Sequence, residues 1–154
     1  MKTKLLTALT MTAALAITFI LSGCATAPMA SQAAHAEALA FTPPFGMANI
    51  YIMRDGLRAP QFLALTTIDG QRTGDLPSDE TYVMKSVPPG VHTVGCMNPN
   101  NGLLWTPITF TAQAGQNYFF VTNCSAWAHR FPIKQISFEE ARKTLKNCER
   151  VQGL

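Results

Sequence analysis

The sequence predicts an all-β sandwich of about seven or eight short antiparallel strands, with one short helix before it and another after it. Three observations predict this fold. From residue 48 onward, short runs rich in β-branched and aromatic residues follow one another at close intervals. Turn signals separate these runs, above all Asp69-Gly70 and Pro88-Pro89-Gly90. The last stretch of the chain has helical spacing instead, and a capping-box pattern opens it.

Residues 1–23 have the layout of a secretory signal, with two lysines followed by an uncharged apolar stretch over residues 5–21. The stretch ends in Leu-Ser-Gly directly before Cys24. This tetrapeptide resembles the lipobox of bacterial lipoproteins, in which the cysteine thiol receives a diacylglycerol and becomes the new N-terminus. The apolar run is also near the length that spans a bilayer. A membrane-spanning anchor is therefore the alternative, but the tetrapeptide favours lipidation of Cys24.

Lipidation would make a membrane the first partner of the protein. Each buried acyl CH2 group contributes about 0.8 kcal/mol, and the three acyl chains of the lipoprotein family imply permanent attachment. Residue 25 is alanine, whereas an aspartate there retains enteric lipoproteins at the inner membrane. By that resemblance we expect a location on the outer membrane, facing the periplasm.

The charge balance argues against nucleic acid as a partner. The chain has 12 basic and 9 acidic residues, and two of the basic residues, Lys2 and Lys4, lie in the expected signal. The mature chain would then carry about one net positive charge, without the charged blocks typical of nucleic-acid binding. About 130 residues remain after the signal, enough for one domain with a hydrophobic core.

Residues 24–46 are predicted to tether the lipid to the domain, which we place at residues 47–154. Within the tether, residues 31–40 contain good helix formers, and Pro43-Pro44 would end the helix. An isolated helix of this length is marginal. Two alternatives therefore stand, a helix that packs on the domain and a flexible spacer. The residues expected to make the packing contacts are Met29, Ala33 and Leu39.

The predicted sandwich begins with a strand over residues 48–54, whose apolar residues alternate. The residues on one face of this strand are Ala48, Ile50 and Ile52. Residues 61–68 and 71–76 would form a hairpin around Asp69-Gly70, because both residues of that turn tolerate positive φ.

The remaining predicted strands include one that contains a proline. These strands cover residues 81–87, 91–96, 103–112, 116–123 and 131–136. Because Pro107 cannot donate a ladder hydrogen bond, strand 103–112 is expected to be an edge strand or to contain a bulge.

A short helix is predicted after Ser137, which forms a capping box with Glu140. Acidic residues in its first turn and basic residues further along match the helix dipole. The residues expected on its buried face are Phe138, Ala141, Leu145 and Cys148. Its basic face would be solvated or would touch an anionic surface.

Several short motifs occur together in a fixed order. They are Met29-Ala30, Phe41-Thr-Pro-Pro-Phe-Gly46, Ile50-Tyr-Ile-Met-Arg54, Ile68-Asp-Gly70, Pro89-Gly-Val-His-Thr93 and Ala114-Gly-Gln-Asn-Tyr-Phe119. Over most of the mature chain this order resembles a family of small bacterial lipoproteins that carry a domain of unknown function. Residues 61–76 lack some of the family's usual glycines, and three mature cysteines are not a general family feature. The resemblance implies an immunoglobulin-like or transthyretin-like sandwich and supplies no catalytic residues.

Three cysteines remain once Cys24 is lipidated, namely Cys96, Cys124 and Cys148. An oxidising envelope favours one disulfide, and three pairings are open. The order of the predicted strands favours Cys96–Cys124, with Cys124–Cys148 as the next alternative. A zinc site made of the three cysteines with His92 or His129 is disfavoured, because no closely spaced cysteine pair is present.

Two classes of function stay open, and neither is enzymatic, since no catalytic or cofactor-binding motif is found. The first is a protein-interaction module for an unknown envelope protein. Its candidate surface combines Thr109 on the predicted edge strand with Trp127 and Arg130 of one loop. For Trp127 the alternative, a side chain that caps the end of the core, is favoured. The second is a periplasmic lipoprotein that binds a small molecule or peptide between the sandwich and the helices. No metal or other cofactor is expected.

Overall fold

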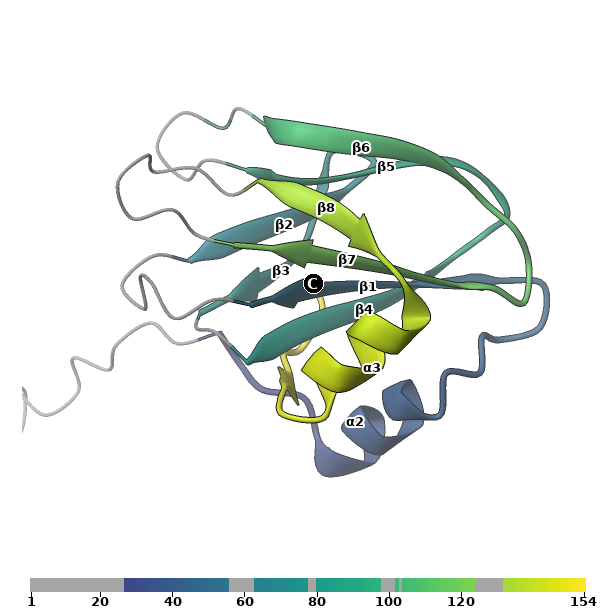
Figure 1. Ribbon diagram of the computed structural model, residues 1–154, viewed down its shortest axis with the longest axis vertical. Helices are drawn as coiled ribbons and strands as arrows, with labels where there is room; N and C mark the ends of the chain where they lie inside the picture. Colours follow the sequence, from purple (N-terminus) through teal and green to yellow (C-terminus); the bar gives the residue numbers. More distant parts are fainter. Residues whose placement is uncertain (1–26, 56–62, 78–79, 98–101, 103, 124–131) are drawn as a thin grey trace, which may run out of the picture.

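The computed structural model describes residues 27–55, 63–77, 80–97, 102, 104–123 and 132–154. These residues form two β-sheets packed face to face, with two short helices on one side (Figure 1). One sheet has five strands in the order β8-β7-β1-β4-β9, and the other has four in the order β3-β2-β5-β6. The predicted all-β sandwich with two short helices is therefore confirmed, with nine strands in the described residues.

The elements follow the predicted order along the chain, except that a final two-residue strand was not predicted and raises the number of described strands to nine instead of seven or eight. The helices are α2 (Gln32–Leu39) and α3 (Phe138–Leu145). The strands are β1 (Ala48–Arg54), β2 (Ala64–Ile68), β3 (Gln71–Leu76), β4 (Thr81–Val87), β5 (Gly90–Met97), β6 (Leu104–Ala112), β7 (Asn117–Thr122), β8 (Ile133–Ile136) and β9 (Glu149–Arg150). None of the helices in the described part of the chain is long and apolar enough to cross a membrane.

Strand β1 lies at the centre of the five-stranded sheet and is buried on both faces. Ala48, Ile50 and Ile52 contribute to the core between the sheets, as the alternation predicted. Tyr51 and Met53 point to the other face, into a second core beneath the helices. β1 pairs antiparallel with β4 but parallel with β7, and β9 is parallel to β4. The sheet is thus mixed, and the prediction that all strands are antiparallel is wrong for these two pairs. Hydrophobic alternation specifies which face a residue lies on but not the direction of the strand.

The predicted hairpin around Asp69-Gly70 joins β2 and β3. The φ angles of Asp69 and Gly70 are +54° and +75°. Both residues are therefore in the left-handed region that a type I′ turn requires. Gly115, in the turn between β6 and β7, likewise has a φ of +77°.

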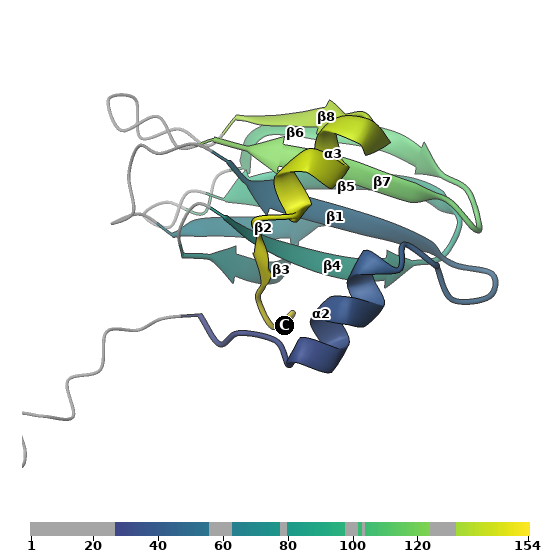
Figure 2. The same ribbon diagram turned by 60° about the horizontal axis from the view of Figure 1, so that its bottom comes forward.

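Both helices lie on the outer face of the five-stranded sheet (Figure 2). The Ser31 side chain caps α2 by accepting a hydrogen bond from the Ala34 N–H at 3.2 Å. The Tyr51 hydroxyl donates to the Ala38 carbonyl at 2.7 Å, and Ala38 is only 1% exposed. Of the two alternatives for residues 31–40, the docked helix is the one observed.

The contacts of α2 differ partly from those expected. Leu39 packs against the second core, whereas Ala33 is exposed and the side chain of Met29 is 43% exposed. Met29 is held instead through its backbone, in an antiparallel bridge with Val151. The sequence around Met29 did not indicate that this segment pairs with Val151, because Val151 lies near the other end of the chain.

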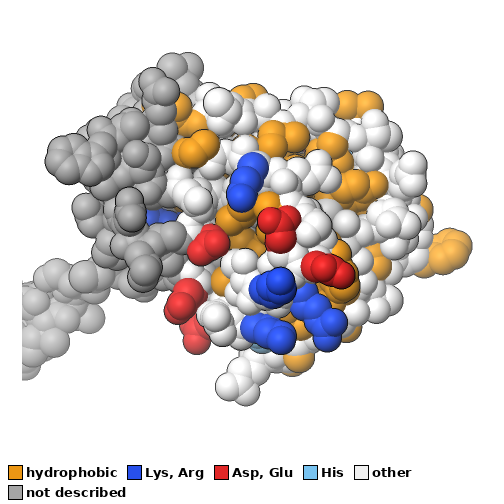
Figure 3. Space-filling model, in the orientation of Figure 1, with side chains coloured by type: hydrophobic (Ala, Val, Ile, Leu, Met, Phe, Trp, Pro, Cys, Tyr) orange, Lys and Arg blue, Asp and Glu red, His pale blue; other side chains and the backbone are white. Residues whose placement is uncertain are grey.

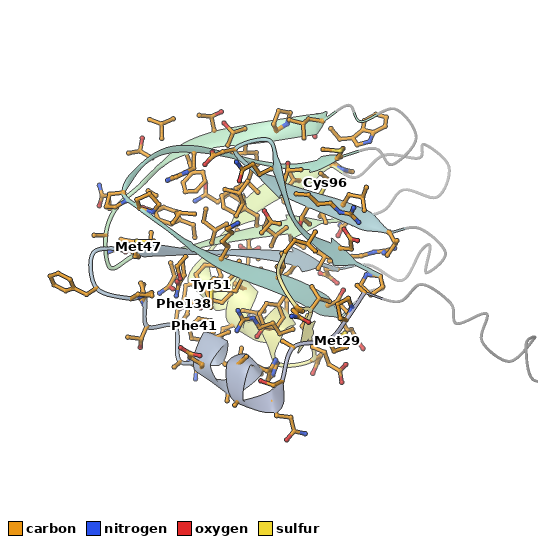
Figure 4. All side chains as sticks on the ribbon, turned by 180° about the vertical axis from the view of Figure 1, so that it is seen from behind. Met29, Phe41, Met47, Tyr51, Cys96 and Phe138 are labelled. Carbon is orange, nitrogen blue, oxygen red and sulfur yellow. The ribbon has the colours of Figure 1, made fainter. Side chains whose placement is uncertain are left out.

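Helix α3 has the capping box that the sequence predicts, with Ser137 and Glu140 bonded reciprocally. Ala141, Leu145 and Cys148 are buried in the second core. Phe138 is 46% exposed, although its ring contacts the rings of Phe41 and Phe119. The helix thus lies on an aromatic layer. Figure 4 shows Phe41, Tyr51 and Phe138 of this layer together.

Candidate interaction surface

The two sheets have four edge strands, and these differ in whether another segment of the chain is hydrogen-bonded to them. The edge strand β9 is covered by residues 28–30, because the Ala30 N–H donates to the Arg150 carbonyl at 2.9 Å and the Gln152 N–H donates to the Pro28 carbonyl at 2.8 Å. The edge strand β3 is capped by the C-terminus, where the Leu154 N–H donates to the Thr73 carbonyl at 2.9 Å. Residues near the two ends of the described chain therefore bond to part of each of these two edges.

The other two edges are β8 and β6. β8 is only four residues long, and its two central side chains, Lys134 and Gln135, are exposed. β6 has nine residues and pairs with β5 on one side. β8 lies beside β6 but pairs with β7. β6 is thus the long open edge within the described residues, as predicted for strand 103–112.

The direction of the β6 backbone groups follows from its register with β5. Thr93 of β5 lies opposite Thr109 of β6. The Thr93 N–H donates to Asp69 Oδ1 at 2.8 Å, and the Thr93 carbonyl accepts from the Asp69 N–H at 2.8 Å. Since both groups of Thr93 are used on the β2 side, Thr93 and Thr109 form a non-hydrogen-bonded pair. The backbone N–H and C=O of Thr109 therefore point outward, away from β5.

Strand alternation extends this direction to Thr111, two residues further along. The hydroxyls of Thr93 and Thr109 lie 3.0 Å apart, as expected for the closer spacing of a non-hydrogen-bonded pair. Thr109 and Thr111 are both exposed. Among the described residues, nothing pairs with these ladder positions on the outer edge of β6, and threonine side chains flank them.

The other half of β6 is interrupted. The register with β5 shifts between Val94 and Cys96, and Thr106 has a positive φ of +33°. Pro107 follows, with no N–H to offer on the outer side. The two features that Pro107 predicts as alternatives, an edge strand and a bulge, are therefore both present. Residues 108–112 remain as the regular part of the edge.

This regular part is held rigidly from within. Ile108 and Phe110 point into the core between the sheets. The ring of Phe110 lies 4.8 Å from that of Tyr118 and 5.1 Å from that of Phe120, measured between centroids. A partner strand would therefore meet a preformed edge, which lowers the entropic cost of pairing.

Thr109 is the one residue of the predicted partner surface that the structure describes. Trp127 and Arg130, the other two, lie outside the described residues, as does the lipidation site Cys24. The grouping of Thr109 with the loop at residues 125–130 therefore stays a prediction.

The described cysteines lie in two different cores. Cys96 is buried between the sheets, and Cys148 is buried in the core beneath the helices. Figure 4 shows Cys96 well away from the aromatic layer. These two residues are free thiols and do not pair with each other. The predicted partner Cys124 lies outside the described residues, so the structure gives no support for the Cys96–Cys124 disulfide.

Both described thiols are held in the neutral form. Burial raises the pKa of Cys96 to about 11, against smaller opposing effects of Thr122 and Arg54. Burial, together with the nearby carboxylates of Asp55 and Glu80, raises the pKa of Cys148 to about 12. Because the thiolate is the nucleophilic form, neither group is suited to covalent chemistry.

His92 has a structural role that the sequence did not reveal. Its Nδ1 lies 2.7 Å from Asp69 Oδ2, and its Nε2 lies 2.8 Å from the Pro88 carbonyl oxygen. Burial lowers the pKa of His92, but the contacts with Asp69 and Pro88 outweigh it, and the net shift is upward. Because both partner oxygens are acceptors, both ring nitrogens donate when the ring is protonated, and neither is then free for a metal. Within the described residues no cluster of metal-binding side chains occurs.

Two open hollows flank the segment at Met29 and Ala30. One has a volume of about 490 Å³ and is also lined by Gln32, His35, Glu149 and Arg150. The other, of about 400 Å³, lies toward Gln152 and Gly153 and shares Arg150. Both open to solvent, unlike the enclosed apolar pockets typical of small-molecule sites.

The outer face of α3 carries charges of both signs. Arg142, Lys143 and Lys146 line a shallow surface depression together with Glu139. Figure 3 shows acidic side chains beside the basic ones on this side of the molecule. Interspersed charges of this kind are typical of a solvated helix face.

Comparison with known proteins gives one distant relative. The chain is 26% identical over 132 residues to a protein of Haemophilus influenzae (strain ATCC 51907 / DSM 11121 / KW20 / Rd) that is described as uncharacterized. The match covers 84% of this chain and 76% of that protein. No family model matches the sequence, and no solved structure matches it.

Proposed function

We propose that this chain is a non-catalytic, lipid-anchored protein of the bacterial cell envelope that binds a partner protein through the open edge of β6. The signal-like segment and the tetrapeptide ending at Cys24 support the anchor and a periplasmic location. The observation that carries the binding function is the contrast between the edges. Residues 28–30 and Leu154 make backbone hydrogen bonds at β9 and β3, whereas no described segment pairs with the outer side of β6.

The expected mode of binding is β-strand addition. An extended segment of the partner pairs with the outward backbone groups of Thr109 and Thr111, and main-chain hydrogen bonds supply most of the affinity. Each such bond contributes about 0.5–1.5 kcal/mol net. The exposed threonines add side-chain contacts on one face of the added strand.

The test uses a photoreactive residue at Thr109 in intact cells, followed by mass spectrometry of the adducts. Thr111→Pro removes one outward N–H but no bond of the β5–β6 ladder, because that N–H points away from β5. Thr111→Val keeps the N–H and the shape of the side chain, and is the matched control.

Capture of one envelope protein by the unchanged chain and the Thr111→Val variant, with up to about tenfold less capture by Thr111→Pro, would support the proposal. Equal capture by Thr111→Pro and Thr111→Val would contradict strand addition, provided that both variants melt at the wild-type temperature. Absence of any adduct would contradict binding at this edge.

A second candidate function is binding of a small polar ligand in the hollow between α2 and β9. Gln32, His35 and Arg150 line it together with Glu149, so a ligand that carries groups of both charges, such as a short peptide, would suit it. The open shape of the hollow favours the first proposal. Calorimetric titration with short peptides and sugar phosphates would test the second, and binding that Arg150→Gln abolishes would support it.

A further inference from the structure

The fold begins only a few residues after the expected lipid. Pro28 and Ala30 are bonded to Gln152 and Arg150, so residues 28–30 act as an additional strand beside β9. Four residue steps separate Cys24 from Pro28. Even a fully extended chain spans at most about 14 Å over that length. If Cys24 is lipidated, Pro28 is therefore held within this distance of the bilayer.

The surface around this point combines apolar side chains with the cationic Arg150, and one acidic residue, Glu149, lines the same hollow. Met29 is 43% exposed and Leu154 is 68% exposed, two of the few large apolar side chains that reach solvent in the described residues. Arg150 lines both hollows beside Met29. Its Nη1 donates to the Ala34 carbonyl at 2.6 Å, and the guanidinium has further N–H donors.

This combination fits the headgroup region of a membrane. Apolar side chains can be inserted at the boundary between headgroups and acyl chains, while a guanidinium binds phosphate oxygens. The opposite side of the sandwich carries β6 and β8, since β9 and β3 form the edges on this side. Contact here would leave the β6 edge open to a partner.

We propose that residues 28–32 and 150–154, which we name the proximal face, rest on the phospholipid headgroups of the bilayer that anchors Cys24, with Arg150 binding lipid phosphate. This inference rests on the lipid anchor of the proposed function. The short connection keeps the face at the membrane. The loop between α2 and β1 lies at the opposite end of the strands (Figure 1).

The experiment places a fluorescent amino acid at Gln152 on the proximal face or at Thr109 on β6, both exposed positions. The lipidated full chain is inserted into vesicles of phosphatidylethanolamine and phosphatidylglycerol with nitroxide-labelled headgroups. We expect quenching severalfold stronger at Gln152 than at Thr109. Equal quenching at the two positions, or stronger quenching at Thr109, would overturn the proposal.

A longer linker between Cys24 and Pro28 tests whether the proximal face binds the headgroups by itself or is only held near them by the short linker. Ten Gly and Ser residues inserted after Thr26 relax the connection. The proposal expects the stronger quenching at Gln152 to persist in that chain and to fall severalfold with Arg150→Gln. Loss of the difference between Gln152 and Thr109 on insertion alone would overturn it. Lys143→Gln, on α3, is the control for a general loss of positive charge.

The outcome also distinguishes this inference from the anchor on which it rests. Mass spectrometry of the N-terminal peptide shows whether Cys24 carries lipid. A peptide without lipid would overturn both the anchor and the proximal face. A lipidated chain that is quenched equally at both positions would overturn the proximal face and leave the anchor standing.

Discussion

The His92–Asp69 pair should make the stability of the domain depend on pH in a defined direction. His92 bridges two turns, since its ring contacts Asp69 of the β2–β3 hairpin and the Pro88 carbonyl before β5. The perturbation is Asp69→Asn. Asparagine tolerates the left-handed conformation of this turn as well as aspartate does, so the variant removes the charge and keeps the hairpin.

The magnitude follows from the exposure of the two partners. A hydrogen bond to a charged group contributes about 1.5–3 kcal/mol when it is protected from water. The His92 side chain is 9% exposed, but that of Asp69 is 48% exposed, so solvent screening reduces the value. We therefore expect Asp69→Asn to lower the free energy of unfolding by about 1–2 kcal/mol near neutral pH.

The sign of the pH dependence is set by the two pKa shifts. The folded pKa of His92 lies above its ordinary value of 6.5, so the pair's stabilisation is complete below 6.5 and is lost as pH rises through the folded pKa. Burial tends to raise the pKa of Asp69, but the bonds from His92 and the Thr93 N–H lower it below 3.8. The same stabilisation is therefore lost in acid as pH falls through that lowered value.

The assay is urea unfolding of the wild type and of Asp69→Asn at several pH values, from about pH 5 to about pH 9 across the histidine range. The difference in unfolding free energy between the two proteins should be largest at the acidic end of this range and shrink toward pH 9. A difference that stays constant, or that grows with pH, would refute the assignment of His92 as an imidazolium in the folded state.

Three further predictions concern packing, capping and thiols. Gly74→Ala places a Cβ 2.9 Å from Val83 Cγ2 and should lower stability by about 1–3 kcal/mol, which thermal unfolding would show; wild-type stability would mean that β3 and β4 separate easily. Ser137→Ala removes the cap of α3 and should cost about 1 kcal/mol in the same measurement, whereas a neutral effect would mean that α3 depends on its aromatic contacts alone. Cys96 and Cys148, both buried, should react with a thiol reagent only after unfolding, and peptide mapping that finds either residue labelled in the native protein would contradict their burial.

Local chemistry made much of the fold predictable. The alternation of residues 48–54, the turn at Asp69-Gly70 and the capping box at Ser137 each depend on residues close together in sequence, and each is found in the structure. Pro107 predicted an edge strand for a physical reason that holds in any sheet, because it cannot donate a ladder bond.

The features that sequence reasoning missed depend on distant partners. The bridge between Met29 and Val151 joins the two ends of the described chain, and no local pattern specifies it. The parallel pairing of β1 with β7 requires the intervening strands to be placed first. His92 gained its role from Asp69, which is 23 residues away. At the candidate site, the sequence predicted that strand 103–112 is an edge strand. It did not predict that other segments of the chain bond to the edge strands β9 and β3.

The open edge of β6 has features that limit pairing with other copies of the chain. A long, flat, apolar edge would invite aggregation with other copies of the chain. Here Pro107, the bulge beside it and the positive φ of Thr106 interrupt one half of the strand, and exposed threonines flank the regular half. A second copy of β6 would meet the same interruption, so extended edge-to-edge pairing is disfavoured. A short partner segment can still use residues 108–112, and this selectivity is what a binding edge requires and an aggregation-prone edge lacks.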